Sequence, residues 1–275
     1  MSEVYPAVGM ISGNGVYPAQ FARAARRAGV ARLVAVAFVN ETEPVLANLV
    51  DELEWMRVGE LDRMIRFFRQ RGIIKAVMVG QIAPSNLFDL RPDLRTIALL
   101  ARLKTKNAES IFGAIGVELA KDGIELIPAT SYLESDIPGP GPVAGPKLKP
   151  DAEEMARWGF GLAKEISRMD IGQTIVVKNG TVLAVEAFEG TNEAIRRGGA
   201  LGKGKSMVIK VSKPNQDLRF DVPCIGPATL ETAREAGISA IVVEAGKTLL
   251  LDPEKVAELS QRHRLTIHAI HHDES

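Results

Sequence analysis

The sequence has little cysteine, no excess of either charge and no long apolar run. Cys224 is the single cysteine, which excludes an intrachain disulfide and any site built from several cysteines. Lys plus Arg and Asp plus Glu both number 34, so no global charge draws the chain to nucleic acid or to an anionic membrane. The first residues lack a basic segment followed by a long apolar one, and no later apolar run is long enough to span a membrane. We therefore expect a soluble, cytoplasmic protein with no nucleic-acid partner.

The N-terminal half of the sequence alternates short apolar runs with segments whose apolar residues recur at helical spacing. The 275 residues suit one large domain or two ordinary ones. Strands are expected at residues 4–11, 33–38 and 76–79, and helices at 18–28, 61–68, 93–104 and 109–121. Strands that alternate with helices predict a parallel sheet with helical crossovers.

A segment dense in proline and glycine interrupts this alternation. Residues 135–150 contain Pro138, Gly139, Pro140, Gly141, Pro142, Gly145 and Pro146. Such density is typical of a linker, although an ordered loop within one domain is the alternative. We expect an N-terminal domain at 1–134, a linker at 135–150 and a C-terminal domain at 151–275.

The second half carries its own local signals. Asp151 is predicted to cap a helix, with Glu154 in the capping-box position. Asn179-Gly180 separates two β-rich runs, at 174–178 and 181–187, and predicts a hairpin. Asp252-Pro253 predicts the start of another helix, because proline suits the first helical turn. This half is therefore also expected to be α/β.

Gly13-Asn14-Gly15 lies between the first predicted strand and the first predicted helix. Glycines there let the backbone approach a ligand, and the helix N-terminus offers N–H groups to a phosphate. The dinucleotide fingerprint is incomplete, because Pro18 occupies the position of its third glycine. The loop is interpreted as a nucleotide or sugar-phosphate contact, with a plain tight turn as the alternative.

A second glycine-rich segment formally matches the P-loop pattern through Gly199, Gly204, Lys205 and Ser206. A P-loop needs a strand before it and a helix after it. Here a helix is predicted before the segment and a strand at 207–211 after it. An ATP-binding P-loop is therefore not expected, although a basic loop could still contact phosphate.

Residues 213–227, KPNQDLRFDVPCIGP, crowd charged and amide side chains between prolines. Such a composition disfavours helix and central strand, so a shaped loop is predicted. A carboxylate in such a loop can hold a divalent metal or orient a water, and neighbouring cations can neutralise phosphate oxygens. Ordinary solvation of a surface loop is the alternative.

The histidines and the cysteine are weaker signals. His268, His271 and His272 have a spacing that could bind zinc, but a mobile polar tail is the favoured interpretation. Cys224 has no nearby histidine in the sequence and is expected to be packed, not nucleophilic.

Five blocks resemble the LpxI family of UDP-2,3-diacylglucosamine pyrophosphatases. They read GMISGNGVYP from Gly9, DGIELIPATSYLE from Asp122, VLAVEAFEGTNEAIRRGG from Val182, KVSKPNQDLRFDVPCIGP from Lys210 and VEAGKTLLLD from Val243. The resemblance implies a Rossmann-like N-terminal domain with a parallel sheet and a second α/β C-terminal domain. It implies metal-dependent hydrolysis that releases UMP and 2,3-diacylglucosamine 1-phosphate (lipid X), a step of lipid A biosynthesis, with Mg²⁺ or Mn²⁺ as cofactor.

The resemblance places Asp221 at the family's essential aspartate, as a catalytic group that holds the metal or the water. The chain departs from the family at Asn192, where an aspartate is common, which suggests that this aspartate is not an indispensable metal ligand. Substrate contacts are expected from Gly13, Asn14, Gly15, Gln81, Thr191, Arg196, Arg197, Lys213, Asn215, Gln216 and Arg219.

A lipid substrate without a spanning helix implies peripheral contact with the inner membrane surface. The basic, partly apolar stretch at 94–106 is the expected docking segment, with an ordinary solvated helix as the alternative. The sequence is compatible with a homo-oligomer as well as a monomer. Two other functions stay open: a nucleotide-binding sensor without chemistry, and a nicotinamide-dependent oxidoreductase, against which the missing third glycine counts.

Overall fold

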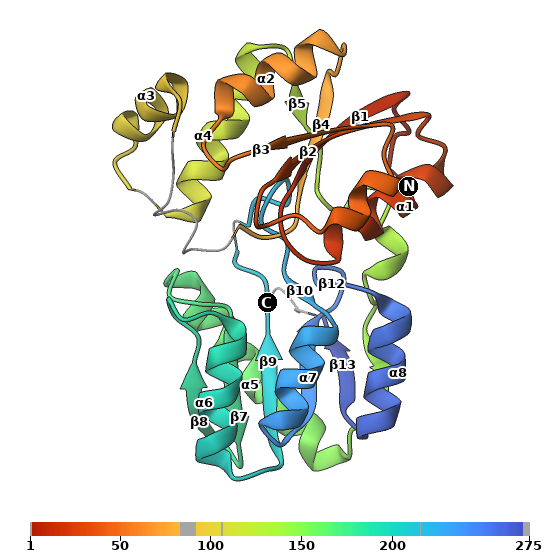
Figure 1. Ribbon diagram of the computed structural model, residues 1–275. Coiled ribbons are helices and arrows are strands. Elements are labelled where there is room, and N and C mark those ends of the chain that lie inside the picture. Colours follow the sequence, from red (N-terminus) through yellow and green to blue (C-terminus); the bar gives the residue numbers. More distant parts are fainter. Residues whose placement is uncertain (1, 83–91, 106, 215, 272–275) are drawn as a thin grey trace. The chain divides into compact units, whose positions relative to one another are not determined.

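The computed structural model describes residues 2–82, 92–105, 107–214 and 216–271 (Figure 1). The chain divides into two compact units. The N-terminal unit contains Met1–Glu134 together with Asp217–Asp221, and the C-terminal unit contains Ser135–Gln216 and Val222–Ser275. Both units are α/β, as the sequence predicts.

The N-terminal unit is built on a five-stranded parallel sheet of order β3-β2-β1-β4-β5. Its strands are β1 (Ala7–Ser12), β2 (Arg32–Phe38), β3 (Glu52–Met56), β4 (Lys75–Val79) and β5 (Glu125–Leu126). The chain winds outward in one direction from β1 to β3 and then restarts on the other side of β1 with β4. This is the order of the first five strands of a Rossmann fold, with its switch point between β1 and β4. The Rossmann-like expectation is confirmed.

Helices cover both faces of this sheet. They are α1 (Tyr17–Ala28), the short 3-10 helix η1 (Pro44–Asn48), α2 (Leu61–Gln70), α3 (Leu94–Arg102) and α4 (Ala108–Lys121). Met64, Leu99 and Leu119 come from α2, α3 and α4 and enter one buried cluster with strand residues. Helix α1 lies on the opposite face (Figure 1).

The C-terminal unit has a mixed six-stranded sheet of order β6-β13-β11-β9-β7-β8. Strands β9, β11 and β13 are parallel, whereas β7 is antiparallel to β8 and β9, and β6 is antiparallel to β13. The strands are β6 (Gly141–Ala144), β7 (Thr174–Lys178), β8 (Thr181–Val185), β9 (Ser206–Lys210), β11 (Ile238–Glu244) and β13 (Thr266–Ile270). A separate parallel pair is formed by β10 (Cys224–Ile225) and β12 (Leu249–Leu250).

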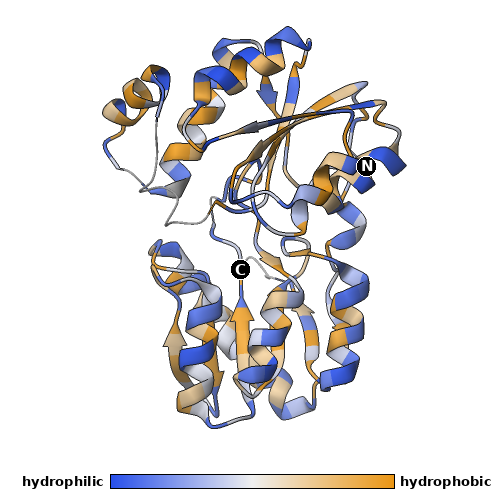
Figure 2. Cartoon of the chain, in the orientation of Figure 1, coloured by the Kyte–Doolittle hydropathy of each residue, from blue (hydrophilic) through white to orange (hydrophobic). Residues whose placement is uncertain are grey.

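Its helices form two layers around this sheet. Helix α5 (Pro150–Arg168) packs on one face, and α6 (Thr191–Gly202), α7 (Pro227–Glu235) and α8 (Pro253–His263) pack on the other. Strand β9 shows why both faces are filled: Met207 and Ile209 join the cluster under α5, and Val208 joins the cluster under the other three helices. Figure 2 shows the middle of β9 as apolar, which is the pattern of a strand buried on both faces.

Several local predictions are confirmed. Asn179 and Gly180 have φ angles of 47° and 72°, the left-handed geometry of a tight hairpin turn between β7 and β8. The Asp252 side chain accepts a hydrogen bond from the Lys255 N–H at 3.2 Å and caps α8. The P-loop-like segment starts within helix α6 and ends at Ser206, the first residue of β9, which is the wrong order for a phosphate-binding P-loop.

Three expectations are wrong in detail. Asp151 does not cap α5: the helix begins at Pro150, and Lys149 occupies the cap position without a capping hydrogen bond from its side chain. The segment expected to be a linker contains β6, an edge strand paired with β13. The polar tail expected from His268 onward begins inside β13, whose pairing with β11 and β6 partly buries His268, and this burial lowers the pKa of His268.

A short piece of the C-terminal half completes the N-terminal unit. The Ala129 N–H donates to the Leu218 carbonyl at 2.8 Å. The Phe220 ring packs against Phe112 of α4, with ring centroids 6.0 Å apart. The segment 217–221, which contains the predicted catalytic aspartate, is therefore held by the N-terminal unit.

Among the described residues, no helix combines the length and the apolar character needed to cross a membrane.

Candidate functional site

The loops after β1 and β4 meet backbone to backbone at the switch point of the N-terminal sheet. The Asn14 N–H donates to the Gln81 carbonyl at 2.6 Å, and the Gln81 N–H donates back to the Asn14 carbonyl at 3.3 Å. A Cβ at Gly13 would overlap the Gln81 carbonyl oxygen, and one at Gly80 would lie 2.7 Å from the Asn14 carbonyl oxygen. Glycine at these positions is thus explained by the contact between the two loops.

This contact limits what the glycine loop can offer a ligand. The N–H groups of Gly13 and Asn14 are already bonded to the carbonyls of Val79 and Gln81. The exposed side chains of Asn14 and Gln81 and the left-handed Gly15, whose φ is 88°, remain at the surface of the loop. The structure therefore brings together all four predicted residues of this region, at the sheet edge where α/β proteins bind ligands.

The loop that carries Asp221 is organised by Asp217. Both carboxylate oxygens of Asp217 accept hydrogen bonds from the Arg219 guanidinium, at 2.9 Å from Nε and 2.6 Å from Nη2. The Asp217 carbonyl accepts from the N–H groups of Phe220 and Asp221, at 3.2 and 2.9 Å. The hydrogen bonds from Arg219 lower the pKa of Asp217, although its partial burial opposes the shift. The predicted phosphate-binding Arg219 is thus paired inside its own loop, and Asp221, a partly buried residue, ends the turn.

In the C-terminal unit, the predicted Lys213 and Gln216 lie together after β9. The Lys213 N–H donates to Gln216 Oε1 at 2.9 Å, and Gln216 Nε2 lies 3.4 Å from Gln173 Oε1. The Lys213 ammonium pairs with Asp170. Asn215, also predicted to contact substrate, lies outside the described residues.

Arg196 and Arg197 lie on the exposed side of α6. Arg196 pairs with Glu193, and Arg197 pairs with Glu189 and donates to the Val185 carbonyl at 2.8 Å. The two arginine side chains are about half exposed, at 49% and 50%. Surface pairs of this kind are worth about 0–1 kcal/mol, so either arginine can exchange its carboxylate for a phosphate at little cost.

A buried ion pair at the carboxyl ends of β9 and β11 was not predicted from the sequence. Lys164 Nζ of α5 lies 3.1 and 3.0 Å from the two carboxylate oxygens of Glu244, and it donates to the Ser212 carbonyl at 2.8 Å. Glu244 also accepts from the Ser212 N–H at 2.7 Å and from its hydroxyl at 2.8 Å. Both charged residues are more than nine-tenths buried.

A second unpredicted charge, Lys210, ends β9. Its ammonium lies 3.1 Å from the hydroxyl oxygen of Thr191, and that hydroxyl donates to Glu186 Oε1 at 2.8 Å. Lys210 and Glu186 are each only 8% exposed. Thr191 was the predicted member of this group. A charged residue that closes an otherwise apolar strand is the signal that could have identified Lys210.

The metal ligand predicted from the sequence, Asp221, is a carboxylate. The described residues contain no group of three or more His, Cys, Asp or Glu side chains arranged to hold a metal ion. Mg²⁺ keeps several waters and is commonly held by one or two carboxylates together with phosphate oxygens of the substrate. The Asp221 carboxylate suits this donor chemistry, and a protein-only cage is not required for it.

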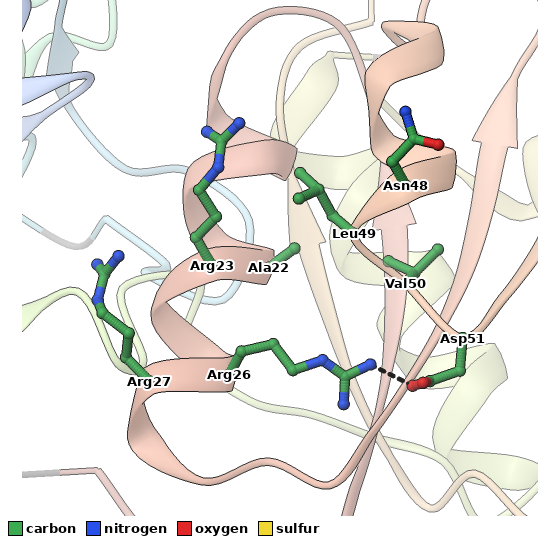
Figure 3. A pocket seen from close by; sticks show the side chains of 8 residues that line it. All are labelled: Ala22, Arg23, Arg26, Arg27, Asn48, Leu49, Val50 and Asp51. Carbon is green, nitrogen blue, oxygen red and sulfur yellow. Dashed lines mark hydrogen bonds and ion pairs between the residues drawn. The ribbon is translucent and has the colours of Figure 1, made fainter.

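A hollow of about 550 Å³ lies elsewhere in the N-terminal unit, between α1 and the segment after η1. Arg23, Arg26 and Arg27 line it, and Arg26 pairs with Asp51 (Figure 3). None of the residues that line this hollow was predicted to contact substrate. The predicted substrate contacts therefore lie outside the lining of this hollow.

Comparison with known proteins gives a consistent result over both units. Residues 7–135 match the family model of the LpxI N-terminal domain, and residues 139–268 match that of the LpxI C-terminal domain. The chain is 32% identical over 262 residues to the UDP-2,3-diacylglucosamine pyrophosphatase LpxI of Caulobacter vibrioides, covering 90% of this chain and 92% of that protein.

Solved structures are less similar. The biotin carboxylase domain of the Hydrogenobacter thermophilus 2-oxoglutarate carboxylase is 13% identical, with a TM-score of 0.28 over 66% of this chain and 36% of that one. The biotin carboxylase subunit of a pyruvate carboxylase is 15% identical, with a TM-score of 0.27 over 66% of this chain and 38% of that one. These likenesses carry no functional argument. The two family matches and the relative, which together cover nearly the whole sequence, show that the chain belongs to the LpxI family.

Proposed function

We propose that this protein hydrolyses the pyrophosphate bond of UDP-2,3-diacylglucosamine to UMP and 2,3-diacylglucosamine 1-phosphate (lipid X), a step of lipid A biosynthesis. The observation that carries the proposal is the match to an LpxI protein of that named activity over 90% of the chain. Matches to both LpxI domains support it.

The chemistry requires charge compensation and an aimed water. A pyrophosphate concentrates negative charge, and its hydrolysis depends on positioning the water in line and offsetting that charge. Asp221 is proposed to hold Mg²⁺ or Mn²⁺, or to orient the attacking water. The bound metal would neutralise charge on the phosphate oxygens. Arg196, Arg197, Lys213 and Arg219 are proposed as further phosphate contacts, with Gln216, Asn215 and Thr191 as polar contacts. The loop residues Gly13, Asn14, Gly15 and Gln81 are proposed to contact part of the UDP-sugar head group.

The decisive experiment measures UMP release from UDP-2,3-diacylglucosamine by the wild-type protein and by Asp221→Ala. We expect Asp221→Ala to bind substrate but to lose turnover by about 10²–10⁴-fold or more, because a carboxylate that orients metal or water acts mainly on the transition state. Wild-type binding of the nucleotide without UMP release would instead favour a sensor.

Asp217→Ala is the matched control in the same loop. It removes the carboxylate that holds Arg219 but leaves the Asp217 carbonyl, which accepts from the Asp221 N–H. We expect a smaller loss of kcat than for Asp221→Ala. A folded Asp221→Ala protein with activity within about threefold of wild type would place the chemistry elsewhere, because loss of a general base costs far more.

Metal dependence is tested separately. Exhaustive treatment with EDTA is expected to abolish hydrolysis, and added Mg²⁺ or Mn²⁺ to restore it. Undiminished activity after chelation would contradict a metal role for Asp221.

Helix α3 supports the proposal of peripheral contact with the inner membrane on its cytoplasmic side. Leu94 and Ile97 are 85% and 49% exposed, and with the exposed Ala98 and Ala101 they follow helical spacing along one face. Arg102, at the end of the helix, and the exposed Lys104 beyond it add positive charge. An apolar face beside basic residues is suited to an anionic lipid surface.

The membrane contact is tested by cosedimentation with anionic vesicles at low and high salt. We expect binding that salt weakens and that Ile97→Glu reduces. Ile74→Glu is the control, because Ile74 is 65% exposed in the same unit but is not part of α3. Equal effects of the two substitutions would show that α3 is an ordinary solvated helix.

A further inference from the structure

Two buried lysines at the same edge of the C-terminal sheet differ in their hydrogen bonding. Lys164 Nζ reaches both oxygens of Glu244 and the carbonyl of Ser212, at 2.8 to 3.1 Å. Its charge is neutralised by a carboxylate, and its three N–H donors all have acceptors within reach. This is the arrangement expected of a lysine with a structural role.

Lys210 is buried to the same extent but has few partners. Each lysine is 8% exposed. Within the described part of the chain, the one hydrogen-bond acceptor of the Lys210 ammonium is the Thr191 hydroxyl at 3.1 Å, and no carboxylate lies within 4.0 Å of it. An ammonium has three donors, so two are left without a described acceptor. A buried charge in this state is unfavourable unless another anion supplies the missing bonds.

The position of the ammonium adds to this imbalance. Thr191 is the first residue of α6, so the Lys210 ammonium lies at the positive end of a 12-residue helix. The cap residue is Gly190, which has no side chain to cap the helix, and no side chain among the described residues accepts hydrogen bonds from the first N–H groups of α6. Those groups have no acceptor within the helix either. The Lys210 ammonium and the N-terminus of α6 therefore both place positive charge beside Thr191.

Glu186 does not neutralise Lys210 directly. Its Oε1 accepts the Thr191 hydroxyl proton at 2.8 Å, and that hydroxyl oxygen in turn faces Lys210. Glu186 thus orients Thr191, and Thr191 holds the ammonium in place. In this arrangement Glu186 and Thr191 are positioning residues, and the donors without a described acceptor are those of Lys210 and of the first turn of α6.

We propose that Lys210 and the N-terminal turn of α6 form a binding site for a phosphoryl group. A phosphate carries the negative charge and the several acceptor oxygens that these donors lack, and helix N-termini favour such anions. The identification of this group as part of the substrate pyrophosphate rests on the proposed function. Lys210 then offsets charge that grows on the phosphoryl oxygens during hydrolysis.

The test compares Lys210→Met with Lys164→Met and with the conservative Lys210→Arg. Melting temperature is measured for each protein alone and with inorganic pyrophosphate or UDP, and kcat/KM is measured by UMP release. A ligand that binds the folded state raises the melting temperature, so loss of the site removes that rise.

We expect pyrophosphate and UDP to stabilise the wild-type protein but not Lys210→Met. Lys210→Met is expected to keep or raise the melting temperature of the free protein, because it removes an uncompensated buried charge. Its kcat/KM is expected to fall by about 10²–10³-fold, the usual effect of losing one donor to a developing oxyanion. Lys210→Arg is expected to restore part of both the binding and the activity. Lys164→Met is expected to lower the melting temperature markedly.

Several results would overturn the phosphoryl site. One is a melting temperature for Lys210→Met that falls as far as that of Lys164→Met, which would give both lysines the same structural role. Others are a wild-type protein that neither anion stabilises, or a Lys210→Met protein whose anion response and kcat/KM match wild type. Failure of the proposed function is distinguishable: a wild-type protein that releases no UMP, yet needs Lys210 to respond to pyrophosphate, keeps the site and loses the reaction.

Discussion

At the carboxyl ends of β1 and β4, backbone groups form hydrogen bonds with one another. At the carboxyl ends of β9 and β11, buried charged side chains form an ion pair instead. In the N-terminal unit, the loops at Gly13 and Gly80 approach closely enough to bridge Asn14 and Gln81. In the C-terminal unit, Lys164 and Glu244 form an ion pair that also binds Ser212. Both sites lie at the carboxyl ends of neighbouring parallel strands. Backbone hydrogen bonds stabilise the first, and a buried ion pair stabilises the second.

The difference predicts different sensitivities to substitution. A backbone bridge depends on the absence of side chains, so adding a single carbon disrupts it. A buried ion pair depends on both partners, so removing one leaves an unpaired charge in a poorly hydrated place.

Lys164→Met is expected to lower the free energy of unfolding by about 3–5 kcal/mol, because it leaves the Glu244 carboxylate buried without its cation. Urea denaturation measures the change. Adding Glu244→Leu to this variant is expected to recover part of the loss, because an apolar pair carries no desolvation penalty. Losses that simply add in the double variant would show that the two residues are not energetically coupled.

Gly13→Ala is expected to lower the free energy of unfolding by about 1–3 kcal/mol, since the new Cβ overlaps the Gln81 carbonyl and forces the two loops apart. The control is Gly161→Ala in α5, where an added Cβ meets nothing within 4 Å. There, alanine is expected to stabilise by about 0.5–1 kcal/mol through helix propensity. A Gly13→Ala protein as stable as wild type would mean that the bridge between the loops is not tight.

The smallest effect is expected from the Asp217–Arg219 pair, in which the two side chains are 27% and 48% exposed. The folded pKa of Asp217 is lowered, so the pair stabilises the fold above the unfolded pKa of about 4 and loses this contribution as pH falls through the lower folded value. Exposure limits the contribution to about 0–1 kcal/mol.

Comparison of wild type with Asp217→Asn by urea unfolding at pH 7 and pH 3 measures this contribution. The difference in stability is expected to be present at pH 7 and to shrink at pH 3. A difference that stays constant with pH would assign the effect to the shape of the loop instead of its charge.

The fold was predictable where the signal is local. Asn179-Gly180 and Asp252-Pro253 specify their turn and cap by their own backbone and side-chain chemistry, so neither needed knowledge of the rest of the chain. Strand β3 (Glu52–Met56) was missed because it is an edge strand of mixed, partly exposed residues, and β5 because it is only two residues long. Strand β13 was not predicted, because its burial comes from neighbours that are distant in sequence.

The candidate site shows the same limit. Asp221 could be predicted from the family resemblance, and the loop Gly13-Asn14-Gly15 from its glycine motif. The Lys164–Glu244 pair was not, because its partners are 80 positions apart and neither residue stands out in its own segment. The sequence marks Lys210 only as a charge at the end of an apolar strand, because its burial and its single described acceptor depend on neighbours that only the structure shows.

The segment 217–221 has a consequence for synthesis of the protein. It packs on Phe112 and Ala129, yet it leaves the ribosome only after β6 to β9 of the C-terminal unit have been made. A domain that is continuous in sequence can finish folding as soon as it emerges from the ribosome. Synthesis adds about 5–20 residues per second. Here the N-terminal unit must wait several seconds for its last piece, with the Phe112 ring and the Ala129 N–H uncovered meanwhile. A protein of residues 1–134 alone would lack the segment 217–221 and would keep the Phe112 ring and the Ala129 N–H uncovered permanently.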